Sequence, residues 1–175
     1  TGKVFTRAEL QTILDLAEKH DAFVITDEPY EHIVYEPHEH VYMHSLPGAS
    51  ERVIVCNSLS KTYSITGWRL GYVQAAPHII AQARKVHDFL TVGAAAPLQE
   101  AAIAGLELPD SYYQGLRDLY TAKRDVFLNH LRATGLLFTE PHGAYYVLMD
   151  ISSLGFPTDT EAAEWFVRKI GVAGV

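Results

Sequence analysis

The first 110 residues alternate between two apolar patterns. In residues 7–20 apolar side chains recur three or four positions apart, as on the buried face of a helix. Short continuous apolar runs, typical of strands buried on both faces of a parallel sheet, occupy residues 23–26, 53–56 and 70–75. Further helices, each with a proline near its start, are predicted at residues 77–90 and 97–106. This alternation predicts an α/β fold with parallel strands.

The pattern changes after residue 110. Residues 110–134 carry the longest helical pattern of the chain, and Gly135 is predicted to end that helix. Beyond it we expect strands at residues 136–138 and 145–149 and a last helix at residues 159–170. The chain is therefore divided into residues 1–110, part of a large domain, and residues 111–175, a long connecting helix followed by part of a smaller α+β domain.

Composition narrows the functional classes. The 175 residues include 14 Lys and Arg against 21 Asp and Glu, a net charge of −7, so the chain lacks the basic surface of a general nucleic-acid binder. One cysteine, Cys56, excludes an internal disulfide and a cysteine-based zinc site. No apolar run approaches the roughly 20 residues of a membrane span. We expect a cytoplasmic protein with no membrane and no nucleic-acid partner.

Residues 58–72 carry the most informative polar pattern, because they lie between two predicted strands. Ligands of open α/β sheets bind where strands end, and Lys61 is placed there. The hydroxyls of Ser58 and Ser60, with Arg69 nearby, can coordinate a phosphate. On these residues alone, Lys61 is either a phosphate clamp or a nucleophile that forms a Schiff base.

Other residues also have two interpretations. Asp27 follows the first predicted strand and is a second site candidate, or it is only a turn cap. Arg69 can alternatively form an ion pair with Asp27 or Glu28. The tyrosine pairs at residues 112–113 and 145–146 are predicted to pack in the core or an interface. No metal site is expected, because a surface loop rich in Pro and Glu holds the histidines with ligand-like spacing: His38, His40 and His44.

Residues 58–72, Ser-x-Ser-Lys-Thr-x-x-x-x-Gly-Trp-Arg-x-Gly-Tyr, resemble the cofactor-lysine signature of the class I/II aminotransferases. These are pyridoxal-phosphate-dependent enzymes of fold type I, in the aspartate aminotransferase superfamily. Residues 26–31, 1–3 and 141–146 resemble three further motifs of the family, in the same order. The resemblance implies a three-layer α/β/α large cofactor-binding domain, present in part, and part of a smaller α+β C-terminal domain. It also indicates a central-to-C-terminal fragment, which we expect to be inactive alone.

The resemblance assigns a role to each candidate. Lys61 would form the internal aldimine with pyridoxal 5′-phosphate and carry protons, in a cationic, partly desolvated pocket that lowers its pKa. Asp27 would be a buried carboxylate beside the pyridine nitrogen, and Tyr30 would hydrogen-bond the phenolic oxygen. The cofactor phosphate is assigned to Ser58, Ser60 and Arg69.

The implied activity is transfer of an amino group from an L-amino acid to a 2-oxo acid, by a protein that is a homodimer at full length. Residues 87–100 resemble the branch of the family that acts on aromatic, methionine, glutamine or kynurenine side chains. Two alternatives stay open: a pyridoxal-phosphate C–S β-lyase of the same fold, and a non-catalytic aminotransferase-like effector domain of a transcription regulator.

Overall fold

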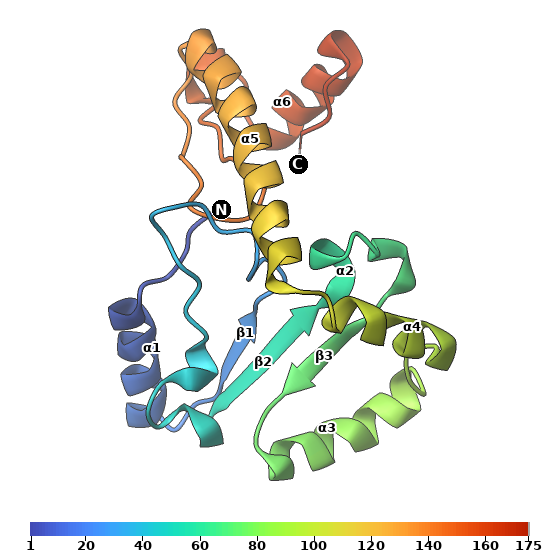
Figure 1. The fold of residues 1–175 in the computed structure, drawn as a ribbon. Coiled ribbons are helices and arrows are strands. Elements are labelled where there is room, and N and C mark those ends of the chain that lie inside the picture. The colour runs from blue at the N-terminus through green and yellow to red at the C-terminus, as the bar shows by residue number, and fades with distance from the viewer. Residues whose placement is uncertain (175) are drawn as a thin grey trace.

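A three-stranded mixed sheet lies at the centre of the computed structural model, which describes residues 1–174 (Figure 1). Its strands, in spatial order, are β1 (Val24–Asp27), β2 (Val53–Ser58) and β3 (Gly71–Gln74). β1 is parallel to β2, with Asp27 opposite Cys56, whereas β3 is antiparallel to β2, with Gly71 opposite Ser58. The last residues of β1 and β2 and the first residue of β3 therefore share one edge of the sheet.

The prediction that the third strand is parallel is wrong. A parallel return requires a crossover of a dozen or more residues over one face of the sheet, usually through a helix. Residues 59–70 instead form the short helix α2 (Leu59–Thr62) and a 3-10 turn (Thr66–Trp68) beside the sheet edge. The chain then turns straight back along β2, which gives the antiparallel pair.

The predicted helices form, with their ends within one residue of the expected positions. These are α1 (Arg7–Lys19), α3 (Pro77–Leu90), α4 (Ala96–Leu106), α5 (Asp110–Thr134) and α6 (Asp159–Trp165). Thr6 caps α1 in a reciprocal capping box with Glu9, and Gly135 ends α5 with a left-handed φ of 74°. The last predicted helix forms as α6 followed by a π-helical turn, Phe166–Ile170.

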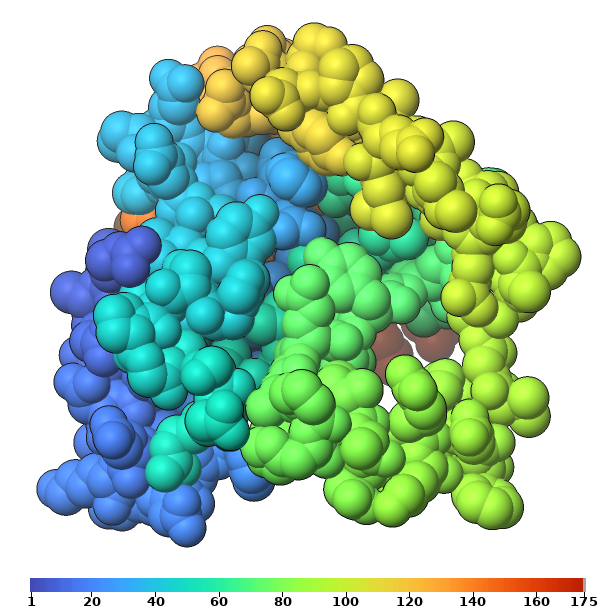
Figure 2. Space-filling model, turned by 60° about the horizontal axis from the view of Figure 1, so that its bottom comes forward, coloured from blue at the N-terminus to red at the C-terminus, as the bar shows by residue number. Residues whose placement is uncertain are grey.

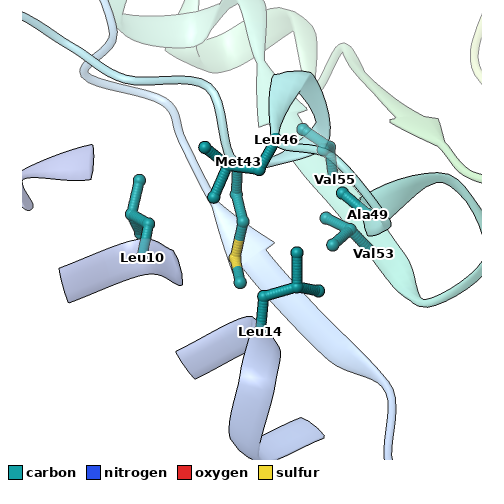
Figure 3. Packing of buried hydrophobic residues seen from close by; sticks show 7 residues of the cluster. All are labelled: Leu10, Leu14, Met43, Leu46, Ala49, Val53 and Val55. Atoms are coloured by element: carbon teal, nitrogen blue, oxygen red, sulfur yellow. The ribbon is translucent and has the colours of Figure 1, made fainter. Parts of the chain in front are cut away.

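The main apolar cluster lies between α1 and one face of β2 (Figure 3). Val53 and Val55 point to this face because side chains two apart in a strand share a side. Short 3-10 helices at Met43–Ser45 and Ala49–Glu51 close the cluster from the loop between β1 and β2. Its buried members are Leu10, Leu14, Met43, Leu46, Ala49, Val53 and Val55.

The prediction that all three strands are buried on both faces holds only in part. Ile25, on the side of β1 away from α1, is 69% exposed, and all four residues of β3 are exposed. Helix α3 has no buried residue, and its Phe89 is 94% exposed. Figure 2 shows an opening between α3 and the segment that leads into α4. Within residues 1–174, α1 thus covers one face of the sheet and the opposite face stays open.

The strands predicted at residues 136–138 and 145–149 do not form as extended strands. They meet at one isolated bridge, Phe138 with Met149. The ladder stops there because residues 142–144 pair elsewhere: the amide of Tyr35 donates to the His142 carbonyl and the amide of Ala144 donates to the Ile33 carbonyl, each at 2.8 Å. The segment that precedes Tyr145 is thereby fixed to the loop after β1. The division of the chain at residue 110 stays a prediction.

We expect Leu14→Ala to lower the free energy of unfolding of the protein by about 2–5 kcal/mol, because the change opens a cavity in the main cluster. Leu14 is 3% exposed. The control is Leu16→Ala on the same helix, where the side chain is 51% exposed and the change should stay within about 0.5 kcal/mol. Urea unfolding of the protein at its natural length measures both, and equal losses would show that α1 does not pack as described.

Candidate active site

The shared edge of the sheet gathers the candidate residues from separate parts of the sequence. Asp27 ends β1, Ser58 ends β2, Lys61 lies in α2, and Arg69 stands two residues before β3. Ser58 is the N-cap of α2, and its hydroxyl accepts the amide N–H of Ser60 at 3.1 Å. The cap turns the chain from strand to helix within one residue, so Lys61 is held at the edge.

The return from α2 to β3 is tightly held. The Leu70 carbonyl accepts both the amide N–H of Leu59, at 3.1 Å, and the Ser58 hydroxyl, at 3.4 Å. At Gly71 a Cβ atom would lie 2.5 Å from the Asn57 carbonyl oxygen, so β2 and β3 approach this closely only with glycine there. Serine and glycine at these positions therefore keep the ends of β2 and β3 together.

Arg69 adopts a left-handed conformation, with φ 56°, and its side chain is exposed. Its Nη1 donates to the Thr66 carbonyl at 3.1 Å. The ion pairs formed within residues 1–174 do not include Arg69, so the alternative pairing with Asp27 or Glu28 is not observed. The guanidinium stays accessible to an anion at the edge.

A buried polar pair that the sequence analysis did not find lies beneath Ser58. The Asn57 amide donates to Glu31 Oε1 at 2.8 Å, while Asn57 Oδ1 accepts the amide N–H of Ser58 at 2.6 Å. Asn57 is buried and Glu31 partly buried. This link joins the end of β2 to the loop after β1, and no periodicity or spacing would have predicted it.

Four tyrosines pack together beside Lys61 and form what we call the tyrosine cluster: Tyr30, Tyr120, Tyr145 and Tyr146. The Tyr145 ring meets Tyr30 edge-on at 5.2 Å and stacks on Tyr120 at 5.7 Å. The Tyr30 hydroxyl donates to the Tyr146 hydroxyl at 3.0 Å. Burial and its bonds to the two neighbouring phenols raise the pKa of Tyr30, so its hydroxyl keeps its proton. Tyr145 and Tyr146, which are 40% and 39% exposed, are thus not core residues, and their packing in an interface stays a prediction.

Lys61 lies against the tyrosine cluster. Its Nζ is 5.6 Å from the centroid of the Tyr145 ring. Hydrogen bonding to Tyr145 raises the pKa of Lys61, although desolvation acts the other way. Desolvation raises the pKa of Tyr145, but its bonds to Lys61 and Tyr30 outweigh this and hold that pKa below its usual value. Within residues 1–174 the pKa of Lys61 is therefore raised and not lowered as expected, because hydrogen bonding to the Tyr145 phenol outweighs desolvation.

The candidate residues line two hollows. One, of about 360 Å³, is lined by Lys61 and Tyr145 together with Ser60, Ser64, Thr66 and Tyr120. The other, of about 570 Å³, has Asp27, Tyr30 and Tyr146 in its wall. Lys61 and Tyr30 line different hollows, and both contact the Tyr145 ring. Asp27 lies beside Tyr30 but is exposed, not buried as expected.

The three histidines with ligand-like spacing contact other side chains, and the rings of His40 and His44 both lie against Tyr42, at 4.6 and 5.6 Å. His38 stacks on His142 with 3.7 Å between ring centroids, and His40 Nε2 lies 2.8 Å from Oε2 of the buried Glu28. No group of three or more His, Cys, Asp or Glu side chains within residues 1–174 is arranged to hold a metal ion. None of the helices in that range is both long and apolar enough to cross a membrane.

Residues 1–173 match the family described as aminotransferase class I and II, and the chain belongs to this family. Kynurenine–oxoglutarate transaminase 3 of Mus musculus is 40% identical to the chain over 183 aligned residues, which cover 95% of the chain and 40% of the relative. Methionine aminotransferase of Escherichia coli (strain K12) is 34% identical over 175 residues, which cover 100% and 45%.

Solved structures of aminotransferases are similar to the chain over nearly its whole length. An aromatic aminotransferase from Pyrococcus horikoshii OT3 matches with a TM-score of 0.91 and 34% identity, over 99% of the chain and 47% of its own length. N-succinyldiaminopimelate aminotransferase from Mycobacterium tuberculosis gives 0.94 and 31%, over 100% and 46%. The expected fold class is therefore confirmed as the α/β fold of fold-type I aminotransferases, with a mixed sheet. The chain spans less than half the length of these relatives.

Tyr145→Phe is expected to lower the pKa of Lys61, because the phenol that stabilises the ammonium is lost while the ring stays. The pH at which Lys61 becomes reactive toward an acylating reagent should fall. Peptide mass spectrometry of the cofactor-free protein at its natural length measures this. Tyr146→Phe is the control, because the Tyr146 hydroxyl bonds to Tyr30, and its effect should be smaller. An unchanged or higher midpoint in Tyr145→Phe would contradict the contact.

Proposed function

We propose that the chain carries the lysine centre of a pyridoxal-phosphate-dependent aminotransferase, which moves an amino group from an L-amino acid to a 2-oxo acid. The observation that carries the proposal is the placement of Lys61 between Ser58 and Arg69 at the sheet edge, with its amine against the tyrosine cluster. Membership of the aminotransferase family supports the same reaction class.

The side chains present fit pyridoxal 5′-phosphate. An amine suits its aldehyde, and a carboxylate suits a protonated pyridine nitrogen. Hydroxyl and guanidinium donors suit its phosphate, since arginine offers a planar fork to phosphate oxygens. We assign the aldehyde to Lys61, the ring nitrogen to Asp27 and the phenolic oxygen to Tyr30. The phosphate is assigned to Ser58, Ser60 and Arg69. Once bound, the cofactor supplies an electron sink for a carbanion at the substrate Cα.

The chain's own groups supply the proton chemistry. We assign to Lys61 Nζ the role of taking a proton from the substrate Cα and of delivering it to the carbon of the cofactor aldehyde, two atoms away. It must first be neutral, and the raised pKa indicates that the Tyr145 phenol favours its charged form. We therefore expect the Tyr145 phenol to slow the attack of Lys61 on the cofactor aldehyde at neutral pH.

Transamination is favoured over C–S β-elimination and over a non-catalytic effector domain, because the reported relatives carry aminotransferase names. Names that refer to kynurenine, methionine and aromatic substrates support an aromatic or thioether amino donor. Release of pyruvate and ammonia from a cysteine conjugate, without a new amino acid, would favour the lyase. The homodimer and the cytoplasmic location stay predictions.

Borohydride reduction of the holoprotein at its natural length, followed by peptide mapping, is expected to label Lys61 alone. The reason is that Lys61 lies at the sheet edge with the phosphate donors, whereas Lys85 lies on the exposed helix α3 and Lys123 on α5. Lys61→Arg keeps the charge, removes a usable amine and should abolish the label. A label on Lys85 or Lys123 would refute the assignment.

Asp27→Asn is expected to leave cofactor bound but to reduce turnover by about 10³-fold, because a neutral amide cannot stabilise a protonated ring nitrogen. The control is Asp21→Asn, an exposed carboxylate at the far end of β1. Steady-state kinetics with saturating cofactor measure both. Turnover of Asp27→Asn close to that of the unaltered protein would mean that Asp27 does not reach the ring.

A further inference from the structure

The first turn of α5 contacts the helix that carries Lys61. The Tyr112 hydroxyl donates to the Thr62 carbonyl at 2.7 Å, and the Tyr112 ring stacks on the Tyr63 ring at 6.0 Å with 18° between the ring planes. Thr62 follows Lys61 directly and is the last residue of α2. Carbonyls in the last turn of a helix receive no amide from that helix, so Tyr112 supplies a donor that α2 cannot.

The Thr62 carbonyl depends on the Tyr112 hydroxyl because Thr62 is buried. Thr62 is only 4% exposed, so water cannot readily replace the phenol as a donor. Burial also raises the pKa of Tyr112, which keeps the hydroxyl protonated and therefore able to donate. A buried carbonyl deprived of its partner would be strongly disfavoured, and the turn would shift to reach another donor.

The helix α2 depends on such help, because its four residues form only one turn. One backbone bond closes it, from the Tyr63 amide to the Leu59 carbonyl at 3.2 Å. Ser58 fixes the start of the turn, and Tyr112 is bonded at its end. The turn that carries Lys61 is thus bonded at its start by Ser58 and at its end by Tyr112, which lies 50 residues from Thr62 in sequence.

We propose that Tyr112 is a positioning residue for Lys61, acting through the Thr62 carbonyl. The proposal rests on the function assigned above to Lys61. The same helix places Tyr120 on Tyr145, the ring against which the Lys61 amine lies, so α5 contacts both the backbone turn and the surroundings of the amine. Loss of the Tyr112 hydroxyl should loosen the turn and misplace the amine without removing any group that touches the cofactor.

Tyr113 provides a matched control. Its hydroxyl lies 2.9 Å from the Tyr63 hydroxyl and its ring lies 4.3 Å from His32, so it makes a bond of the same kind between side chains only. Tyr112→Phe and Tyr113→Phe therefore each remove one phenol from neighbouring positions of one helix. Only the first removes a bond to the backbone next to Lys61.

The first measurement is amide hydrogen exchange of the cofactor-free protein at its natural length, read on the peptide that covers residues 59–66. We expect about fivefold faster exchange in Tyr112→Phe, the factor expected for one net hydrogen bond, and little change in Tyr113→Phe. The second measurement is the rate at which added pyridoxal phosphate becomes trapped on Lys61 by borohydride. We expect a fall of at least severalfold in Tyr112→Phe only.

The two measurements distinguish failure of the function proposed for Lys61 from failure of the positioning role of Tyr112. If Lys61 of the unaltered protein takes no label, the proposed function fails, while the exchange data still decide whether Tyr112 holds the turn. Unchanged exchange in Tyr112→Phe, or an equal increase in Tyr113→Phe, overturns the positioning role. Faster exchange with an unchanged trapping rate also overturns it, because the turn would then move without consequence for Lys61.

Discussion

Parallel pairing of β1 with β2 is the constraint on which the rest of the site depends. Because both strands run in the same direction, Asp27 and Ser58 finish at one edge, and everything that follows β2 begins there. The antiparallel return of β3 then brings the segment that contains Arg69 back to the same edge. One pairing choice therefore concentrates a carboxylate, hydroxyls, an amine and a guanidinium from a 43-residue stretch of chain, residues 27–69, in one place.

The environment of the amine differs from the simple picture of a lysine surrounded by positive charge. Hydroxyl groups dominate around Lys61, and they stabilise its protonated form through hydrogen bonds and ring contacts. Among the tyrosines, Tyr30 is driven toward its neutral form and Tyr145 toward its ionised form. Two chemically identical side chains 5.2 Å apart thus play opposite electrostatic roles, set by which of them faces the amine.

Local features of the chain could be predicted from the sequence because their causes are local. The capping box at Thr6, the stop at Gly135 and the positions of Lys61 and Asp27 after apolar runs all depend on residues close in sequence. The direction of β3 could not be predicted, since it depends on how residues 59–70 fold. The tyrosine cluster was also missed, because Tyr30 and Tyr146 are 116 positions apart and no periodicity connects them.

Helix α5 connects the turn that carries Lys61 to a buried residue far from it. It is fixed at Tyr112 and runs 16 residues further to the buried Leu128, roughly 24 Å at 1.5 Å per residue. Over that length a tilt of about 10° about Tyr112 would displace Leu128 by roughly 4 Å. Leu116, packed against Ile33 and Tyr35, and Tyr120, stacked on Tyr145, hold the same helix, so a tilt of α5 would disturb both the turn that carries Lys61 and the rings beside its amine.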